Sequence, residues 1–129
     1  FYVDRPCFFM LNVGETHYPY TCPGQEEDLP HLSGVHGVVK QLKGGGVVQA
    51  DDAPAWFDDA LLQRLRSSQV DSVRYLDGLF EQLYDLVPAN TWITVTSDHG
   101  ELFGEAGYFG HGPINHDKVI EVPLVEGLV

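Results

Sequence analysis

The densest group of chemically capable side chains lies in TSDHGELFGEAGYFGHG, residues 96–112. The run TWITVTS, residues 91–97, is β-branched and aromatic, which predicts a strand that delivers Asp98 and His99 together at its C-terminal end. In open α/β sheets, ligands bind at that end of the strands. A carboxylate oxygen beside an imidazole nitrogen can bind one divalent cation, and this pair of donors suits Ca, Mn or Zn. A bare Asp-His pair is equally compatible with a turn in which Asp98 caps the next segment and His99 packs on a neighbour.

Two further histidines lie in loops that suit the same chemistry. His17 stands in THYPY, after the apolar run CFFMLNV at residues 7–13, and His111 stands between glycines in GHG. Each alone fits an ordinary loop histidine. Two imidazoles and a cation around an oxyanion would stabilise the charge that develops in a transition state. Together with the Asp-His pair, they predict a site for an anionic group.

The other candidates carry weaker signals. His31 and His36 are five positions apart, which is wrong for one helix face, and no carboxylate supports them. His116 is expected near the rim of the site at most. The glycines of residues 44–46 precede Val-Val rather than Lys-Ser or Lys-Thr, so they do not form a phosphate-binding P-loop.

Composition excludes several classes of partner. The 129 residues carry 7 Lys plus Arg and 19 Asp plus Glu, so the net charge of −12 opposes binding to nucleic acid or to an anionic membrane surface. The apolar share of 43% is ordinary for a globular domain. No apolar stretch reaches the ~18 residues of a membrane span. Cys7 and Cys22 form no disulfide framework, although a single bridge between them stays open.

The secondary-structure signals predict an α/β fold. The apolar run at residues 7–13 predicts a strand buried on both faces. Apolar residues spaced by three or four predict a long helix over 57–87, and Pro88 ends it. Because a strand, a crossover helix and a second strand at 91–97 follow one another, we expect a parallel pair in a mostly parallel sheet flanked by helices.

The rest of the chain is expected to complete a single domain over residues 1–129. VIEVPLVEG at 119–127 predicts a last strand. Residues 21–55 are rich in Gly and Pro and predict a long loop excursion, with a short helix near 35–42.

These motifs resemble the alkaline phosphatase superfamily. SDHGELFGEAGYFGHG, followed by VIEVPLV, looks like its C-terminal metal-binding segment, and the nearest pattern is that of the sulfatases and of the phosphoethanolamine and lipoteichoic-acid-type transferases. RPCFFMLNVGETHYPY is similar to the family's middle strand and its His-x-Pro-Tyr-like loop. The helix with Gln69, Tyr75, Leu76 and Asp77 is similar to the helix before the DHG strand. Residues 21–55 match nothing in the family pattern.

The resemblance implies roles for four residues. Asp98 and His99 would be ligands of one divalent metal ion, and His17 and His111 would contact the transferred sulfuryl or phosphoryl group. Two-metal members of the superfamily have an Asp four residues before the middle His. Val13 stands there in this chain, so the single-metal branch fits better.

The family nucleophile has no counterpart in this sequence. Cys7 lacks the Cys-x-Pro-x-Arg context of a sulfatase nucleophile, and Cys22 lacks the arginine. Thr96 is expected inside a strand, and Glu15 does not occupy the family's acidic ligand position. We therefore expect the C-terminal portion of a sulfatase-like hydrolase or transferase of sulfate or phosphate esters that is inactive alone.

The alternative from a different class is a non-catalytic binding or interaction module that keeps the sulfatase-like fold. For either reading, we expect self-association or pairing with a missing N-terminal half, because the strands at 7–13 and 91–97 would leave edges uncovered. The type of ester, the leaving alcohol, the metal and the cellular location stay open at this level.

Overall fold

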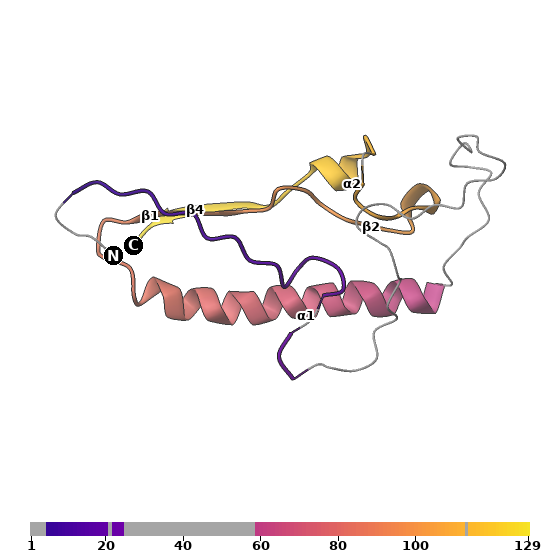
Figure 1. Cartoon of the computed structure of the whole chain (residues 1–129), viewed down its shortest axis with the longest axis horizontal. Helices are drawn as coiled ribbons and strands as arrows, with labels where there is room; N and C mark the ends of the chain where they lie inside the picture. Colours follow the sequence, from indigo (N-terminus) through magenta and orange to yellow (C-terminus); the bar gives the residue numbers. More distant parts are fainter. Residues whose placement is uncertain (1–4, 21, 25–58, 113) are drawn as a thin grey trace.

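The structure is a computed structural model, which describes residues 5–20, 22–24, 59–112 and 114–129. Figure 1 shows one long helix with a two-stranded ribbon above one half and a smaller loop-rich unit above the other half. The chain thus combines helices with strands. In order, the elements are α1 (Asp59–Tyr84), β1 (Trp92–Thr96), β2 (Leu102–Phe103), η2 (Glu105–Gly107), β3 (Phe109–Gly110), α2 (Asp117–Ile120) and β4 (Leu124–Leu128).

Helix α1 confirms the predicted long helix. It has 26 residues, and Asp59 lies in its first turn, where a negative charge interacts favourably with the helix dipole. Its buried residues Leu65, Ser72 and Leu76 are spaced by seven and four, so they form a stripe on one face. The helix ends at Tyr84, a few residues before Pro88.

Strand β1 confirms the strand predicted at 91–97, but its partner is not the expected one. It pairs antiparallel with β4, in a register from Trp92 opposite Leu128 to Thr96 opposite Leu124. The expected parallel pair does not occur among the described residues, in which both sheets are two-stranded and antiparallel.

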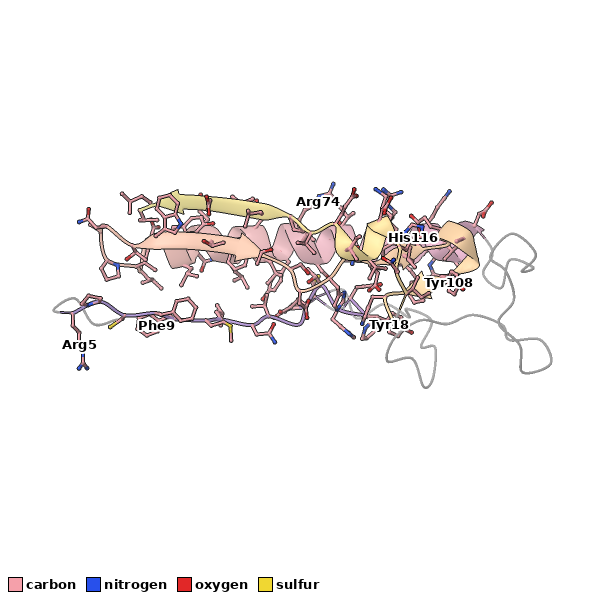
Figure 2. The ribbon with its side chains drawn as sticks, turned by 90° about the horizontal axis from the view of Figure 1, so that it is seen from above. Arg5, Phe9, Tyr18, Arg74, Tyr108 and His116 are labelled. Carbon is pink, nitrogen blue, oxygen red and sulfur yellow. The ribbon has the colours of Figure 1, made fainter. Side chains whose placement is uncertain are left out.

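The prediction of a strand at residues 7–13 is also wrong. The segment has no strand assignment, and Figure 2 draws the chain around Phe9 as a trace separate from the β1–β4 ribbon. Phe8 and Met10 are 89% and 85% exposed, so the run is not buried on two faces. A strand needs the backbone groups of a partner edge, and β1 pairs with β4 within the described part of the chain.

The last strand is shorter than predicted. Residues 117–120 form the short helix α2, whose N-cap His116 accepts a hydrogen bond from the Lys118 N–H at 3.0 Å. Pro123 has no N–H for a ladder, and β4 begins directly after it. The helix predicted near 35–42 and most of the 21–55 connection lie outside the described residues.

The core that supports the site is largely aromatic. Tyr20, Leu65 and Phe109 are 1%, 0% and 0% exposed, and Tyr18, Leu61, Leu62 and Phe103 pack against them. The Tyr18 ring meets the Tyr20 and Phe109 rings edge-on, with centroids 5.7 and 5.6 Å apart. Among the described helices, none is both long and apolar enough to cross a lipid bilayer.

Candidate functional site

The end of strand β1 places Asp98 and His99 as the sequence predicts. The Ser97 hydroxyl donates to the His99 carbonyl at 2.7 Å, and the Gly100 N–H donates to the Val119 carbonyl at 2.7 Å. A Cβ atom at Gly100 would overlap the carbonyl oxygen of Lys118. The turn after His99 therefore requires glycine, because α2 passes directly beside it.

The loop that carries His17 is built from two successive turns. The His17 N–H donates to the Gly14 carbonyl at 3.0 Å, and the Tyr20 N–H donates to the His17 carbonyl at 2.8 Å. Tyr20 has a φ of 56°, a left-handed conformation that is uncommon for a bulky residue. The Gln69 amide of α1 donates to the Thr16 carbonyl at 3.4 Å and ties the loop to the helix.

The hairpin of β2 and β3 carries His111. Its register pairs Leu102 with Gly110, so the next residues outward, Glu101 and His111, lie opposite each other. The hairpin turn includes Gly104 with a φ of +110°, a conformation that favours glycine. The short strands thereby fix His111 beside the end of β1.

These three segments bring the histidines together. His17, His99 and His111 each offer a ring nitrogen, and the three nitrogens lie within 4.8 Å of one another. The His99 and His111 rings stack with centroids 3.7 Å apart, and the His17 ring lies edge-on to both, at 6.3 and 5.2 Å. The Asp98 Oδ1 lies 3.6 Å from the His99 Nε2. His17, His99 and His111 thus lie around one space, and the exposed Asp98 side chain lies beside His99 without being a member of the histidine cluster.

The hydrogen bonds of the rings define which nitrogen is available. The Nδ1 atoms of His17 and His99 lie 2.8 Å from the carbonyl oxygens of Tyr18 and Gly100. The Nδ1 atom of His111 lies 2.9 Å from the Glu101 Oε1. Because a carbonyl or an ionised carboxylate can only accept, each Nδ1 carries the proton and donates. In the neutral rings, Nε2 is therefore the atom with a free lone pair.

Sequence reasoning missed Glu101 and Tyr20. The Glu101 side chain is 5% exposed, and the Tyr20 hydroxyl donates to its Oε2 at 2.9 Å. Burial raises the pKa of Tyr20 well above its usual value, and the charge of Glu101 and the hydrogen bond to it raise that pKa further. The phenol therefore keeps its proton. Glu101 lies opposite His111 because the chain folds back at residues 104–107, and this register is a property of the folded hairpin.

The donor set fits a divalent metal ion. Histidines that bind metals through one nitrogen usually donate the other N–H to a carbonyl or a carboxylate, which is the pattern of all three rings here. Imidazole nitrogens with a nearby carboxylate suit Zn or Mn. The Glu15 Oε2 is buried without a hydrogen-bond partner among the described residues. Glu15 precedes His17 in the same loop, although it is not a member of the histidine cluster.

The remaining candidates are not members of the histidine cluster. His116 caps α2. Cys7 is exposed, Cys22 is buried, and both are free, so the disulfide that the sequence left open is not formed. The Cys22 Sγ lies 3.2 Å from the Ser72 Oγ of helix α1.

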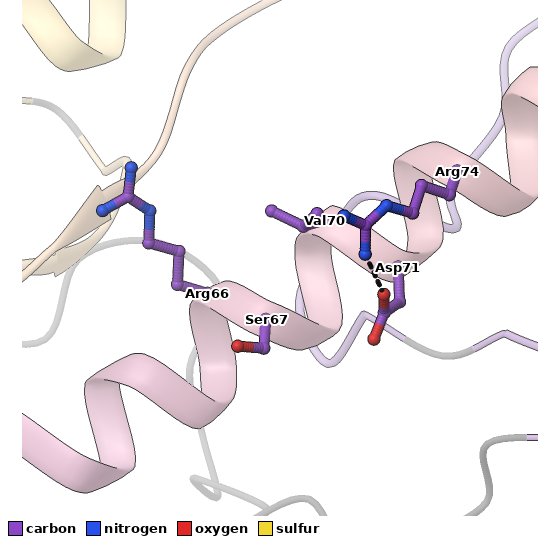
Figure 3. A pocket seen from close by; sticks show the side chains of 5 residues that line it. All are labelled: Arg66, Ser67, Val70, Asp71 and Arg74. Atoms are coloured by element: carbon purple, nitrogen blue, oxygen red, sulfur yellow. Dashed lines mark hydrogen bonds and ion pairs between the residues drawn. The ribbon is translucent and has the colours of Figure 1, made fainter.

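A separate hollow lies along helix α1 (Figure 3). Its lining includes Arg66, Val70 and Arg74, and Arg74 forms an ion pair with Asp71 at 2.9 Å. The Arg74 side chain is 74% exposed, and no histidine or cysteine lines the hollow. The potential metal-ligand cluster of the described residues is therefore that of His17, His99 and His111, away from this hollow's lining.

Comparison with known proteins yields one family and one curated relative. A sequence model of the Sulfatase family matches residues 2–125. The uncharacterized sulfatase YidJ of Escherichia coli (strain K12) is 25% identical over 141 residues, which cover 95% of this chain and 26% of that protein. The chain thus spans about a quarter of the length of this relative. No solved structure matches the chain significantly.

Proposed function

The chain belongs to the sulfatase family, and from that premise we propose that it forms part of a site that transfers the sulfuryl or phosphoryl group of an ester. In this proposal Asp98 and His99 hold one divalent metal ion, and His17 and His111 contact the oxygens of the transferred group. The observation that carries the proposal is the convergence of three ring nitrogens, one from each of His17, His99 and His111, within 4.8 Å of one another.

Local donors must create any anion affinity here. The formal net charge of the chain is −12, so its overall field repels sulfate and phosphate esters. Protonated imidazoles donate strong, charge-assisted hydrogen bonds to anionic oxygens. His17 is exposed, whereas the His111 side chain is 20% exposed. His17 would therefore meet the substrate from the solvent side, and His111 from the floor of the site.

The Asp98 carboxylate and the His99 Nε2 lie 3.6 Å apart, which lets both donors face one ion. A bound divalent ion would supply positive charge next to the oxygens of the transferred group. The metal stays open between Ca, Mn and Zn.

The proposal also includes catalytic incompleteness. Covalent transfer needs an activated nucleophile at the metal, and the described cysteines do not meet that need. Cys22 is buried against Ser72, and the exposed Cys7 lies in the extended segment well before the His17 loop. We therefore expect residues 1–129 to bind metal and anion without turning over aryl sulfates or aryl phosphates.

The test is a Mn²⁺ titration of the full chain, followed by the ring-proton signals of its histidines. A paramagnetic ion at the site should broaden the signals of His99, His17 and His111 more strongly than the signal of His116, because broadening falls steeply with distance from the ion. Asp98→Asn should weaken this selective broadening. The matched control is His116→Asn, which alters a histidine outside the cluster and keeps an N-cap side chain at α2.

A second step adds sulfate to the chain loaded with diamagnetic Zn²⁺ and follows the same signals. Shifts at His17 and His111 that exceed the shift at His116 support the proposed anion contacts. Equal Mn²⁺ broadening at all histidines would refute the metal assignment, because it would indicate nonspecific binding. Hydrolysis of a nitrophenyl sulfate or phosphate that disappears in Asp98→Asn would refute the incompleteness.

A further inference from the structure

Glu101 differs from the other acidic residues near the site because both of its oxygens are used. Its Oε1 accepts from the His111 Nδ1 at 2.9 Å, and its Oε2 accepts from the Tyr20 hydroxyl at 2.9 Å. His111 directly follows β3, and Tyr20 lies in the loop that carries His17, so one carboxylate joins two of the segments that build the site. With a side chain only 5% exposed, it has little access to water.

The two hydrogen bonds explain how a carboxylate can be buried there. An ionised carboxylate is stable away from water only when donors satisfy it. The Tyr20 phenol keeps its proton, so it always donates. Because Tyr20 is 1% exposed and packed in the aromatic core, its hydroxyl is held in place and in turn holds Glu101.

Among the three histidines of the cluster, only His111 donates its Nδ1–H to the side chain of Glu101. His17 and His99 donate from Nδ1 to backbone carbonyls of the residues that follow them. These acceptors are present whatever the side chains are. His111 donates to a side chain, so its ring protonation pattern and orientation depend on Glu101.

We propose that Glu101, held by Tyr20, is a positioning residue that keeps His111 in the Nδ1–H form and directs its Nε2 to the space shared with His17 and His99. This inference rests on the proposed function, in which the His111 Nε2 contacts the anionic group. The neutral ring then offers a lone pair from Nε2 to that space, and the protonated ring offers an N–H.

Two other roles for Glu101 fit the geometry less well. A direct metal ligand would need to lie among the potential ligand atoms of the site, yet the group of close ligand atoms consists of His17, His99 and His111 and does not include Glu101. A purely structural link between the two segments would not depend on which ring nitrogen of His111 is protonated. The protonation pattern of His111 therefore distinguishes positioning from a structural role.

The experiment is a long-range ¹H–¹⁵N correlation of the histidine rings in the full metal-free chain, at a pH near 8.5. A free imidazole has a pKa of ~6.5, so this pH is chosen to favour the neutral form of the rings. In the wild-type chain we expect Nδ1–H at His111. In Glu101→Ala, His111 should move toward Nε2–H, the form that free histidine favours, while His17 and His99 keep Nδ1–H.

Glu101→Gln provides the conservative variant, because its amide oxygen can still accept from the His111 Nδ1. We expect it to restore Nδ1–H at His111. Glu126→Gln is the matched control, because Glu126 is exposed on β4, and its spectrum should equal that of the wild type. Nε2–H at His111 in the wild-type chain would overturn the inference, and this measurement needs no variant to fold. Unchanged Nδ1–H in a folded Glu101→Ala would overturn it too.

Sulfate binding to the Zn²⁺-loaded chain separates this inference from the proposed function. If His111 contacts the anion, Glu101→Ala should weaken sulfate binding by about tenfold, which corresponds to ~1.4 kcal/mol. A changed ring form with unchanged sulfate affinity would support the positioning role and refute the His111 anion contact. An unchanged ring form would refute the positioning role whatever the affinity.

Discussion

Replacing Tyr20 by Phe tests the hydrogen bond beneath the site. The substitution removes one hydroxyl and leaves the buried ring in the aromatic core, so it creates almost no cavity. The lost bond joins a phenol to the carboxylate of Glu101 at 2.9 Å. Hydrogen bonds to charged groups contribute about 1.5–3 kcal/mol, and the Glu101 Oε2 would be left without this donor in a side chain that is 5% exposed.

We therefore expect the free energy of unfolding to fall by about 2 kcal/mol. The assay is urea unfolding followed by circular dichroism. If the slope of the unfolding free energy against urea concentration is the same in both chains, the shift in midpoint reports the change in stability alone. The matched control is Tyr84→Phe, which removes the hydroxyl of a tyrosine that is 36% exposed at the end of α1. It should change stability by less than about 0.5 kcal/mol.

The double variant Tyr20→Phe with Glu101→Gln completes a mutant cycle. Because the hydroxyl and the carboxylate contact each other, their effects should not add, and the coupling should exceed about 0.5 kcal/mol. A Tyr20→Phe chain as stable as Tyr84→Phe would refute the reasoning. It would mean that the buried carboxylate does not depend on the phenol.

Three further predictions concern pH, the turn after β1 and the exposed apolar surface. Burial holds the pKa of Tyr20 in the folded state above the unfolded value of ~10. Below pH 10 this group should therefore leave the free energy of unfolding unchanged. Above pH 10 the unfolded chain loses a proton that the folded chain keeps, so the free energy of unfolding should fall by up to ~1.4 kcal/mol per pH unit. Tyr20→Phe should lack this decline in alkaline urea unfolding. Gly100→Ala should destabilise the chain by more than about 2 kcal/mol in thermal unfolding, because its Cβ would meet the backbone of α2, whereas Gly78→Ala, with open space around it, should not. Light scattering should detect self-association, because Met10 is 85% exposed and the strand β4 is exposed throughout; a monomer at high concentration would contradict this.

The elements that depend on local sequence could be predicted, and those that depend on distant partners could not. The apolar spacing of α1 and the β-branched run of β1 are local signals, and both elements are confirmed. Residues 7–13 have the composition of a buried strand, but a strand exists only where another edge supplies hydrogen bonds. The antiparallel pairing of β1 with β4 likewise depends on a strand that is distant in the sequence, so the local sequence of β1 does not indicate it.

The candidate site shows the same division. His17, Asp98, His99 and His111 could be grouped because they stand in motifs that resemble one family. Glu101 could not, because its importance comes from the hairpin register that places it opposite His111. No residue type or spacing in DHGE alone indicates that its carboxylate accepts from a tyrosine 81 positions earlier in the chain.

That sequence separation has a consequence for the local stability of the site. Helix α1 and the β2–β3 hairpin contain local contacts, which close only short loops at a low cost in entropy. The loop of residues 14–20 must find its place across a long stretch of chain, and Tyr20 and the Gln69 amide hold it there. Local unfolding of this loop would carry His17 away while the helix and the hairpin stay formed, and amide exchange should be faster there than in α1. An ion or anion that contacts His17 and the other two rings binds only the form in which this loop is folded. Raising the concentration of that ligand should therefore stabilise the loop against local unfolding.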